Sequence, residues 1–119
     1  MSQIKSYRDL LVWQKAIVLV TDIYKQTQSF PADERFGLTA QIRRSAVSVP
    51  SNIAEGYGRN STGDYKRFLQ MAVGSLYELQ TQLHISNNIK LLTTEAHNPL
   101  VEKTTELDRM LYSLIHKIN

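Results

Sequence analysis

The stretch RRSAVSVPSNIAEGYGRNS, residues 43–61, combines a helical pattern with a proline that should interrupt it. Apolar residues recur here, and just before, at the three- and four-residue steps of one helix face: Leu38, Ile42, Ala46, Val49 and Ile53. Pro50 lies inside this pattern, where it removes a backbone hydrogen bond and crowds the carbonyl of Ala46. Because the neighbouring residues are small, we predict a helix that is kinked at Pro50 and continues toward Tyr57.

Two long segments flank this helix and show the same periodicity. The first, from Asp9 to Gln28, carries an apolar stripe that we predict to face the core: Leu10, Trp13, Ile17, Val20 and Tyr24. The other, from Thr62 to Asn88, follows a glycine-rich break with Ser61 or Thr62 as its N-terminal cap. Its predicted core stripe comprises Tyr65, Phe68, Leu69, Ala72, Leu76, Leu79 and Leu83.

The last helical segment ends near Lys117 and begins either near Thr93-Thr94 or, because Pro99 suits a first helical position, with Asn98 as its cap. Its apolar side has the 3.5-residue average spacing of bundle helices, with Leu100, Thr104, Leu107, Leu111, Leu114 and Ile118. Four amphipathic helices with short connections predict one all-α domain over residues 1–119. The expected architecture is an antiparallel up-down four-helix bundle with a kinked second helix.

Composition narrows the function classes. The chain has 119 residues, no cysteine and a net charge of +3, which removes disulfides and thiolate chemistry and fits a reducing, cytoplasmic setting. The apolar run Ala16–Val20 is too short to cross a membrane, so no membrane association is expected. Residues 1–70 carry a net charge of +4 and residues 71–119 a net charge of −1. This basic first part is compatible with phosphate-bearing partners and also with ordinary solubility charge.

A search for catalytic patterns finds none. No histidine follows a glutamate at the spacing of a di-iron bundle, and neither zinc nor phosphate-loop motifs occur, so we expect no metal, no cofactor and no enzymatic activity. Glu55 and Glu78 could form a carboxylate pair, but they lie on different predicted helices. Arg59, four residues after Glu55, makes an ion pair the favoured interpretation.

Basic side chains near the glycine-rich turn form the candidate nucleic-acid site: Arg43, Arg44, Arg59, Lys66 and Arg67. In this interpretation they contact phosphates, while Tyr57 and Tyr65 stack on bases. The alternative is that Arg59 pairs with Glu55, the other cations are solvated, and both tyrosines pack at the end of the bundle. The sequence leaves the two open.

The first and third helices also carry apolar residues away from their predicted core stripes. A helix that is apolar nearly all round is buried nearly all round, which one small bundle cannot achieve alone. We therefore expect an oligomer interface at these residues: Leu11, Val12, Val18, Leu19, Met71, Gly74 and Ile85.

Two longer motifs, AQIRRSAVSVPSNIAEGYGRNS and the following DYKRFLQMAVGSLYELQTQL, resemble those of bacterial proteins encoded within intervening sequences of 23S rRNA genes. YRDLLVWQKA and FPADERFGL fit the same pattern, so the resemblance covers about residues 7–92. It implies a four-helix bundle that forms a homopentamer. It also implies distant kinship to the accessory variability determinants of diversity-generating retroelements, which bind nucleic acid and a reverse transcriptase, whereas the family itself has no established activity.

We therefore expect a non-enzymatic, cytoplasmic homopentamer that binds RNA, DNA or a nucleoprotein partner such as a reverse transcriptase. The alternative is a protein-interaction scaffold with no role for nucleic acid.

Overall fold

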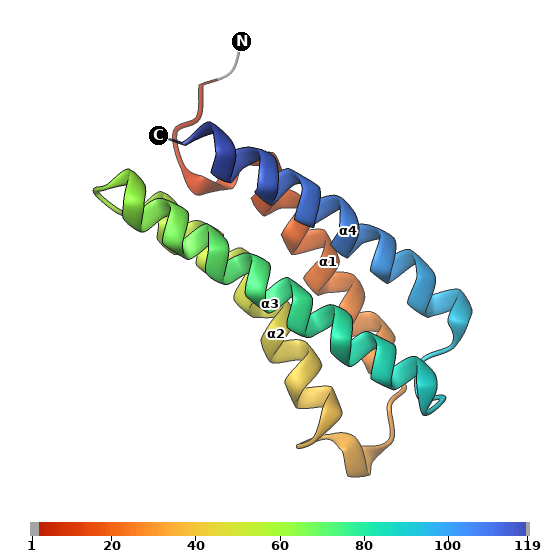
Figure 1. The fold of residues 1–119 in the computed structure, drawn as a ribbon. Helices are drawn as coiled ribbons and strands as arrows, with labels where there is room; N and C mark the ends of the chain where they lie inside the picture. The colour runs from red at the N-terminus through yellow and green to blue at the C-terminus, as the bar shows by residue number, and fades with distance from the viewer. Residues whose placement is uncertain (1–2, 119) are drawn as a thin grey trace.

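The computed structural model describes residues 3–118 and is built from four long α-helices (Figure 1). They are α1 (Leu11–Thr27), α2 (Leu38–Tyr57), α3 (Thr62–Asn88) and α4 (Thr94–Lys117). Two short 3₁₀ turns, η1 (Tyr7–Asp9) and η2 (Ala32–Glu34), precede α1 and α2. Each helix contacts its neighbours in a closed cycle, with α4 returning to α1, which confirms the up-down four-helix bundle.

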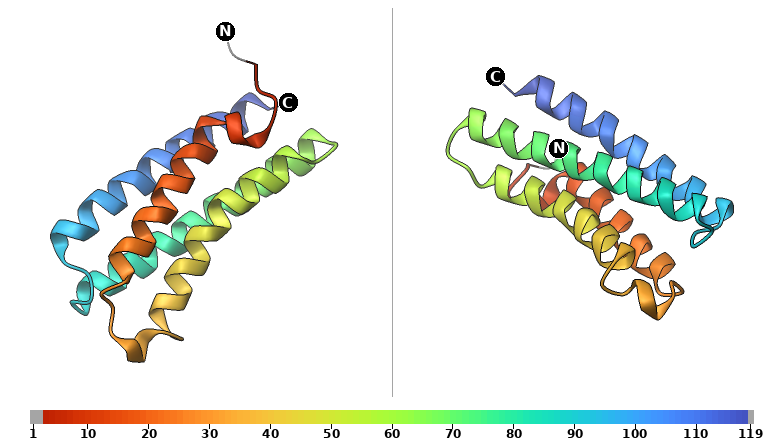
Figure 2. Two further views of the ribbon diagram at one scale, coloured as in Figure 1. Left: turned by 180° about the vertical axis from the view of Figure 1, so that it is seen from behind. Right: turned by 60° about the horizontal axis from the view of Figure 1, so that its bottom comes forward.

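Helix α2 passes through Pro50 without interruption, as the sequence predicts. Ser51 and Asn52, in the turn after the proline, donate side-chain hydrogen bonds to the carbonyls of Val47 and Ser48, at 2.8 and 2.9 Å. Neither bond reaches the carbonyl of Ala46, which loses its ladder bond to the proline; side-chain bonds to the adjacent carbonyls are of the kind that bends a helix. The helix runs beside α3 near their common turn and diverges from it toward η2 (Figures 1 and 2).

Helices α2 and α3 approach each other closely at Gly56. A Cβ atom placed on Gly56 would lie 2.8 Å from the Cβ of Phe68 and 3.1 Å from Cδ1 of Tyr65. Farther along the same pair, Ser48 and Ser75 share a 2.9 Å hydrogen bond between their hydroxyls. These contacts make α2 and α3 the most extensively packed pair in the bundle.

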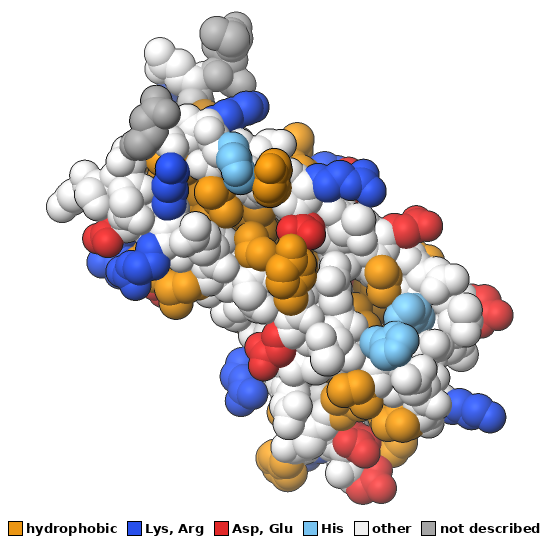
Figure 3. Space-filling model, viewed as in Figure 1, with side chains coloured by type: hydrophobic (Ala, Val, Ile, Leu, Met, Phe, Trp, Pro, Cys, Tyr) orange, Lys and Arg blue, Asp and Glu red, His pale blue; other side chains and the backbone are white. Residues whose placement is uncertain are grey.

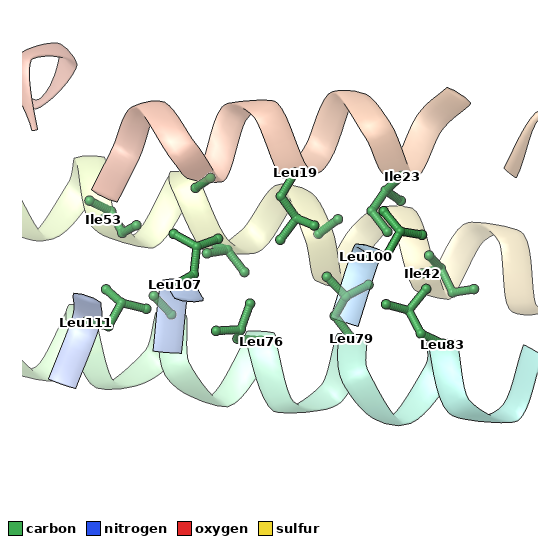
Figure 4. Close-up of a cluster of buried hydrophobic side chains, with 14 of the residues drawn as sticks. Leu19, Ile23, Ile42, Ile53, Leu76, Leu79, Leu83, Leu100, Leu107 and Leu111 are labelled. Carbon is green, nitrogen blue, oxygen red and sulfur yellow. The ribbon is translucent and has the colours of Figure 1, made fainter. Parts of the chain in front are cut away.

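The bounds and core face of α3 agree with the sequence-based prediction. Ser61 is the N-cap and its hydroxyl accepts a 3.1 Å hydrogen bond from the backbone N–H of Asp64. Six of the seven predicted core residues are buried, and Tyr65 is half-buried. The core is a continuous layer of aliphatic side chains from all four helices, into which Leu76, Leu79 and Leu83 of α3 point (Figure 4).

The predicted core face of α1 is wrong. The buried residues are Val12, Ala16, Leu19, Ile23 and Thr27, whereas Ile17 and Tyr24 are exposed. Leu10, Trp13 and Val20 are half-buried and flank the core. Two overlapping stripes in α1 have helical spacing, and the narrower aliphatic stripe is the one that fits between the other helices.

The start of α4 also differs from one of the two predicted positions. The helix begins at Thr94, because the hydroxyl of Thr93 caps it by accepting a 3.2 Å hydrogen bond from the N–H of Ala96. Asn98 is therefore not the cap, and Pro99 lies inside the helix. Pro99 is exposed, so the Glu95 carbonyl whose ladder bond it removes lies within reach of water.

Candidate nucleic-acid interface

The five basic residues predicted to form one site lie in two separate groups. Arg43 and Arg44 are in the first half of α2, whereas Arg59, Lys66 and Arg67 flank the turn between α2 and α3. Sixteen residues separate Arg43 from Arg59, which corresponds to about 24 Å along a helix. The structure therefore does not bring all five side chains together.

Arg43 has a structural role between α1 and α2. Its Nε donates a 2.9 Å hydrogen bond to Oγ1 of Thr27, and its guanidinium carbon lies 4.5 Å from the centre of the Tyr24 ring. Thr27 in turn donates a 2.8 Å hydrogen bond to the carbonyl of Ile23. These contacts fix the guanidinium of Arg43 against the end of α1, away from the α2–α3 turn.

The three cations at the α2–α3 turn, Arg59, Lys66 and Arg67, are here called the turn cluster. The guanidinium carbons of Arg59 and Arg67 lie 4.5 and 5.0 Å from the centre of the Phe68 ring, a cation–π arrangement that orders both side chains. Basic side chains gather at this end of the molecule in Figure 3. The cluster therefore places three cations close together around the turn between α2 and α3.

Two carboxylates lie near the turn cluster. Asp64 forms an exposed ion pair with Arg67 at 3.6 Å, and such surface pairs add little stability. Among the described residues, Glu55 makes no ion pair with Arg59, so the predicted pair does not form within one chain. The turn cluster carries three positive charges, and the nearby Glu55 and Asp64 carry two negative charges, so the turn has a net charge of +1 per chain.

The two tyrosines near the turn pack against each other. The rings of Tyr57 and Tyr65 meet edge to face with centres 6.2 Å apart. Burial, and then the proximity of Tyr57, raise the pKa of Tyr65 above its ordinary value. Both rings therefore pack at the end of the bundle, which favours the packing alternative over base stacking.

Some of the residues predicted to form an oligomer interface are buried in the single chain, and the others are exposed. Val12 and Leu19 lie in the core of the single chain, so their assignment to an interface is wrong. They pack inward because they belong to the true core stripe of α1. The remaining predicted residues are exposed on α1 and α3: Leu11, Val18, Met71, Gly74 and Ile85.

Further exposed apolar side chains were not singled out by the sequence patterns. Phe36, just after η2, is 89% exposed, and Tyr77 and Tyr112 are exposed beside the groove between α3 and α4. Figure 3 shows apolar side chains gathered along this groove. The Tyr77 hydroxyl donates to the Asp108 carboxylate at 3.1 Å, and this hydrogen bond raises the pKa of Tyr77. No periodicity identifies Phe36, because it lies in a connection.

Metal and membrane sites can be assessed only over residues 3–118. This part of the chain holds no group of three or more histidine or carboxylate side chains placed to bind a metal ion. Nor does any helix within it combine the length and apolar character required to cross a membrane.

The fold and the exposed basic turn define an all-α four-helix bundle protein. The family model for 23S rRNA-intervening sequence proteins matches residues 8–113, so the chain belongs to that family. A crystal structure of a protein with unknown function from the S23 ribosomal protein family of Bacteroides thetaiotaomicron is similar, with a TM-score of 0.80 and 25% sequence identity. The match covers 88% of this chain and 98% of that one. No curated protein matches the chain.

Proposed function

We propose that the protein is a non-enzymatic, self-assembling bundle that forms a homopentamer and contacts nucleic acid or a nucleoprotein partner through the turn cluster. The observation that carries this proposal is the apolar surface left on more than one helix. Leu11 and Val18 on α1 are 58% and 53% exposed, and Met71 and Ile85 on α3 are 46% and 43% exposed. Helices α1 and α3 make no packing pair, which places these residues on different sides of the bundle.

Apolar surface on more than one side of the bundle supports a head-to-tail contact, in which one side of each copy binds a different side of the next copy. Such contacts close into rings when the rotation between copies allows it. The family resemblance supplies the number five. In a pentamer the turn cluster would recur five times, so a modest charge excess per chain would become an extended positive surface.

The mass of the protein in solution tests the assembly. We expect light scattering at micromolar concentration to give about five times the 13.6 kDa of one chain. The apolar faces would then be buried between copies, which the hydrophobic effect favours. A monomer at every concentration tested would contradict the proposal.

A second experiment tests the contact with nucleic acid. We expect wild-type protein to bind both RNA and single-stranded DNA weakly and without strong sequence preference, because phosphate contacts carry no sequence information. Alanine at Arg59, Lys66 and Arg67 should weaken binding and flatten the dependence of log K on log salt, by roughly 0.7 per lost contact on a single strand. Mobility shifts at low and near-physiological salt would measure both effects.

The matched control removes three exposed lysines elsewhere, Lys25, Lys90 and Lys117. This variant has the same net charge as the turn-cluster variant, so it should bind more tightly if position matters. Equal losses in the two variants would indicate nonspecific charge attraction. No binding by wild-type protein even at low salt would leave the interaction scaffold as the function.

A further inference from the structure

We propose that the self-association, on which this inference rests, joins the outward side of α3 in one copy to the outward side of α2 and η2 in a second copy of the chain. The side on α3, here called the α3 face, consists of Gly74, Glu78, Ile85 and Ile89. The side on α2, here called the α2 face, consists of Phe36, Arg44 and Val47. The occupant of each face is thus the other face of a neighbouring copy.

The apolar residues on both faces lack cover within one chain. Phe36 is 89% exposed and Val47 is 40% exposed on the α2 face, while Ile85 and Ile89 are 43% and 54% exposed on the α3 face. A phenylalanine ring buries a large apolar area when covered, so its near-complete exposure is costly in an isolated chain. An aliphatic surface such as that of Ile85 and Ile89 would cover it.

The two faces carry opposite charges at their centres. Arg44 is exposed on the α2 face and Glu78 is exposed on the α3 face. Within residues 3–118 neither side chain has an ion-pair partner. Complementary charges of this kind fix the register of an interface and disfavour the wrong pairing of faces.

The heights of these residues along the bundle match. The hydrogen bond between Ser48 and Ser75 marks one level on α2 and α3. Arg44 precedes Ser48 by four residues on α2, and Glu78 follows Ser75 by three residues on α3. Because the two helices are antiparallel, both residues lie on the same side of this level. At about 1.5 Å per residue, the heights of Arg44 and Glu78 differ by about 1.5 Å. A rotation axis that runs along the bundle preserves height, so it would bring Arg44 of one copy beside Glu78 of the next.

Counting residues from the same Ser48–Ser75 level also pairs the apolar residues of the α2 face with those of the α3 face. By the same residue count Leu38, the first residue of α2, corresponds to Ile85, and Phe36 lies beyond it, toward the end of the bundle where Ile89 lies. Val47 falls within about 3 Å of the height of Gly74. A Cβ atom placed on Gly74 would meet nothing within 4 Å, so this position offers open space to a side chain from another copy.

The arrangement of the helices allows such contacts to close. Helices α2 and α3 are neighbours in the bundle, so their outward sides point in different directions but not in opposite ones. A contact between two unlike faces set at an angle curves from copy to copy and can form a ring. Arg44 would then serve assembly, and the turn cluster alone would face a nucleic acid.

Charge reversal tests this interface. We expect Arg44→Glu and Glu78→Arg each to weaken assembly about tenfold or more, because each places like charges opposite one another. The double variant Arg44→Glu/Glu78→Arg should regain most of the wild-type assembly, since it restores an opposite pair. Sedimentation velocity over a concentration series would measure the assembled fraction, and circular dichroism would confirm that each variant remains folded.

Two further variants sharpen the result. Phe36→Ala should also weaken assembly without unfolding the chain, because the ring makes little contact within it. Glu102→Arg, a reversal at an exposed position on α4, should leave assembly unchanged. An assembled wild type whose single reversals keep full mass, or whose double variant fails to recover, would overturn this interface and leave the proposed assembly intact. A monomeric wild type would overturn both.

Discussion

Leu19→Ala should lower the free energy of unfolding by about 3 kcal/mol, within the range seen for leucine truncations in protein cores. Leu19 is fully buried and packs among side chains of the aliphatic core (Figure 4). Its removal would leave a cavity that the four tightly connected helices cannot close. Chemical denaturation followed by circular dichroism would measure the change.

Val18→Ala is the matched control, because Val18 neighbours Leu19 in the chain and is 53% exposed. We expect this change to cost less than about 1 kcal/mol. Equal effects of the two substitutions would contradict the assignment of Leu19 to the core. A charged residue at position 19 would unfold the chain, so it cannot test an oligomer interface.

Gly56→Val should destabilise the protein by about 2 kcal/mol or more through overpacking. Replacing a helical glycine by alanine ordinarily gains about 0.5–1 kcal/mol in helix stability, and replacing it by valine gains less. Here the clash should outweigh that gain, because the Phe68 Cβ at 2.8 Å is attached directly to the backbone of α3 and cannot rotate away. Thermal unfolding would show a lower midpoint.

Gly63→Ala should instead raise the stability of the protein. A Cβ atom at Gly63, in the first turn of α3, would meet nothing within 4 Å. We therefore expect a small gain in stability, about 0.5 kcal/mol. If Gly56→Val proved neutral, the close approach of α2 and α3 at this point would be wrong.

The candidate site shows which functional residues a sequence pattern can predict and which it cannot. The turn cluster could be predicted because its three cations lie close together in the chain around a recognisable turn. The separate role of Arg43 could not, because its partners Tyr24 and Thr27 lie on α1 and no local pattern connects them. The same holds for Phe36, whose exposure depends on how η2 leaves the bundle.

The sequence by itself determined the helices whose signals are local. Ser61 and the glycines near it mark the start of α3, and the main apolar stripes of α2, α3 and α4 define their buried sides. It also determined that Pro50 would not end α2, because small neighbours can accommodate the proline. In each case the deciding interaction joins residues a few positions apart.

Only the tertiary structure decided which side of α1 is buried and where α4 begins. Helix α1 offers two apolar stripes of similar spacing, and the choice between them depends on the shape of the space left by the other three helices. For α4, both Thr93 and Asn98 could act as caps, and Pro99 favoured the start at Asn98. The bundle selected Thr93, whose start leaves Pro99 exposed and buries Leu100 in the core. Packing between distant segments settled the buried side of α1, because its two stripes have the same helical spacing, whereas the hydroxyl of Thr93 settled the start of α4 by capping it.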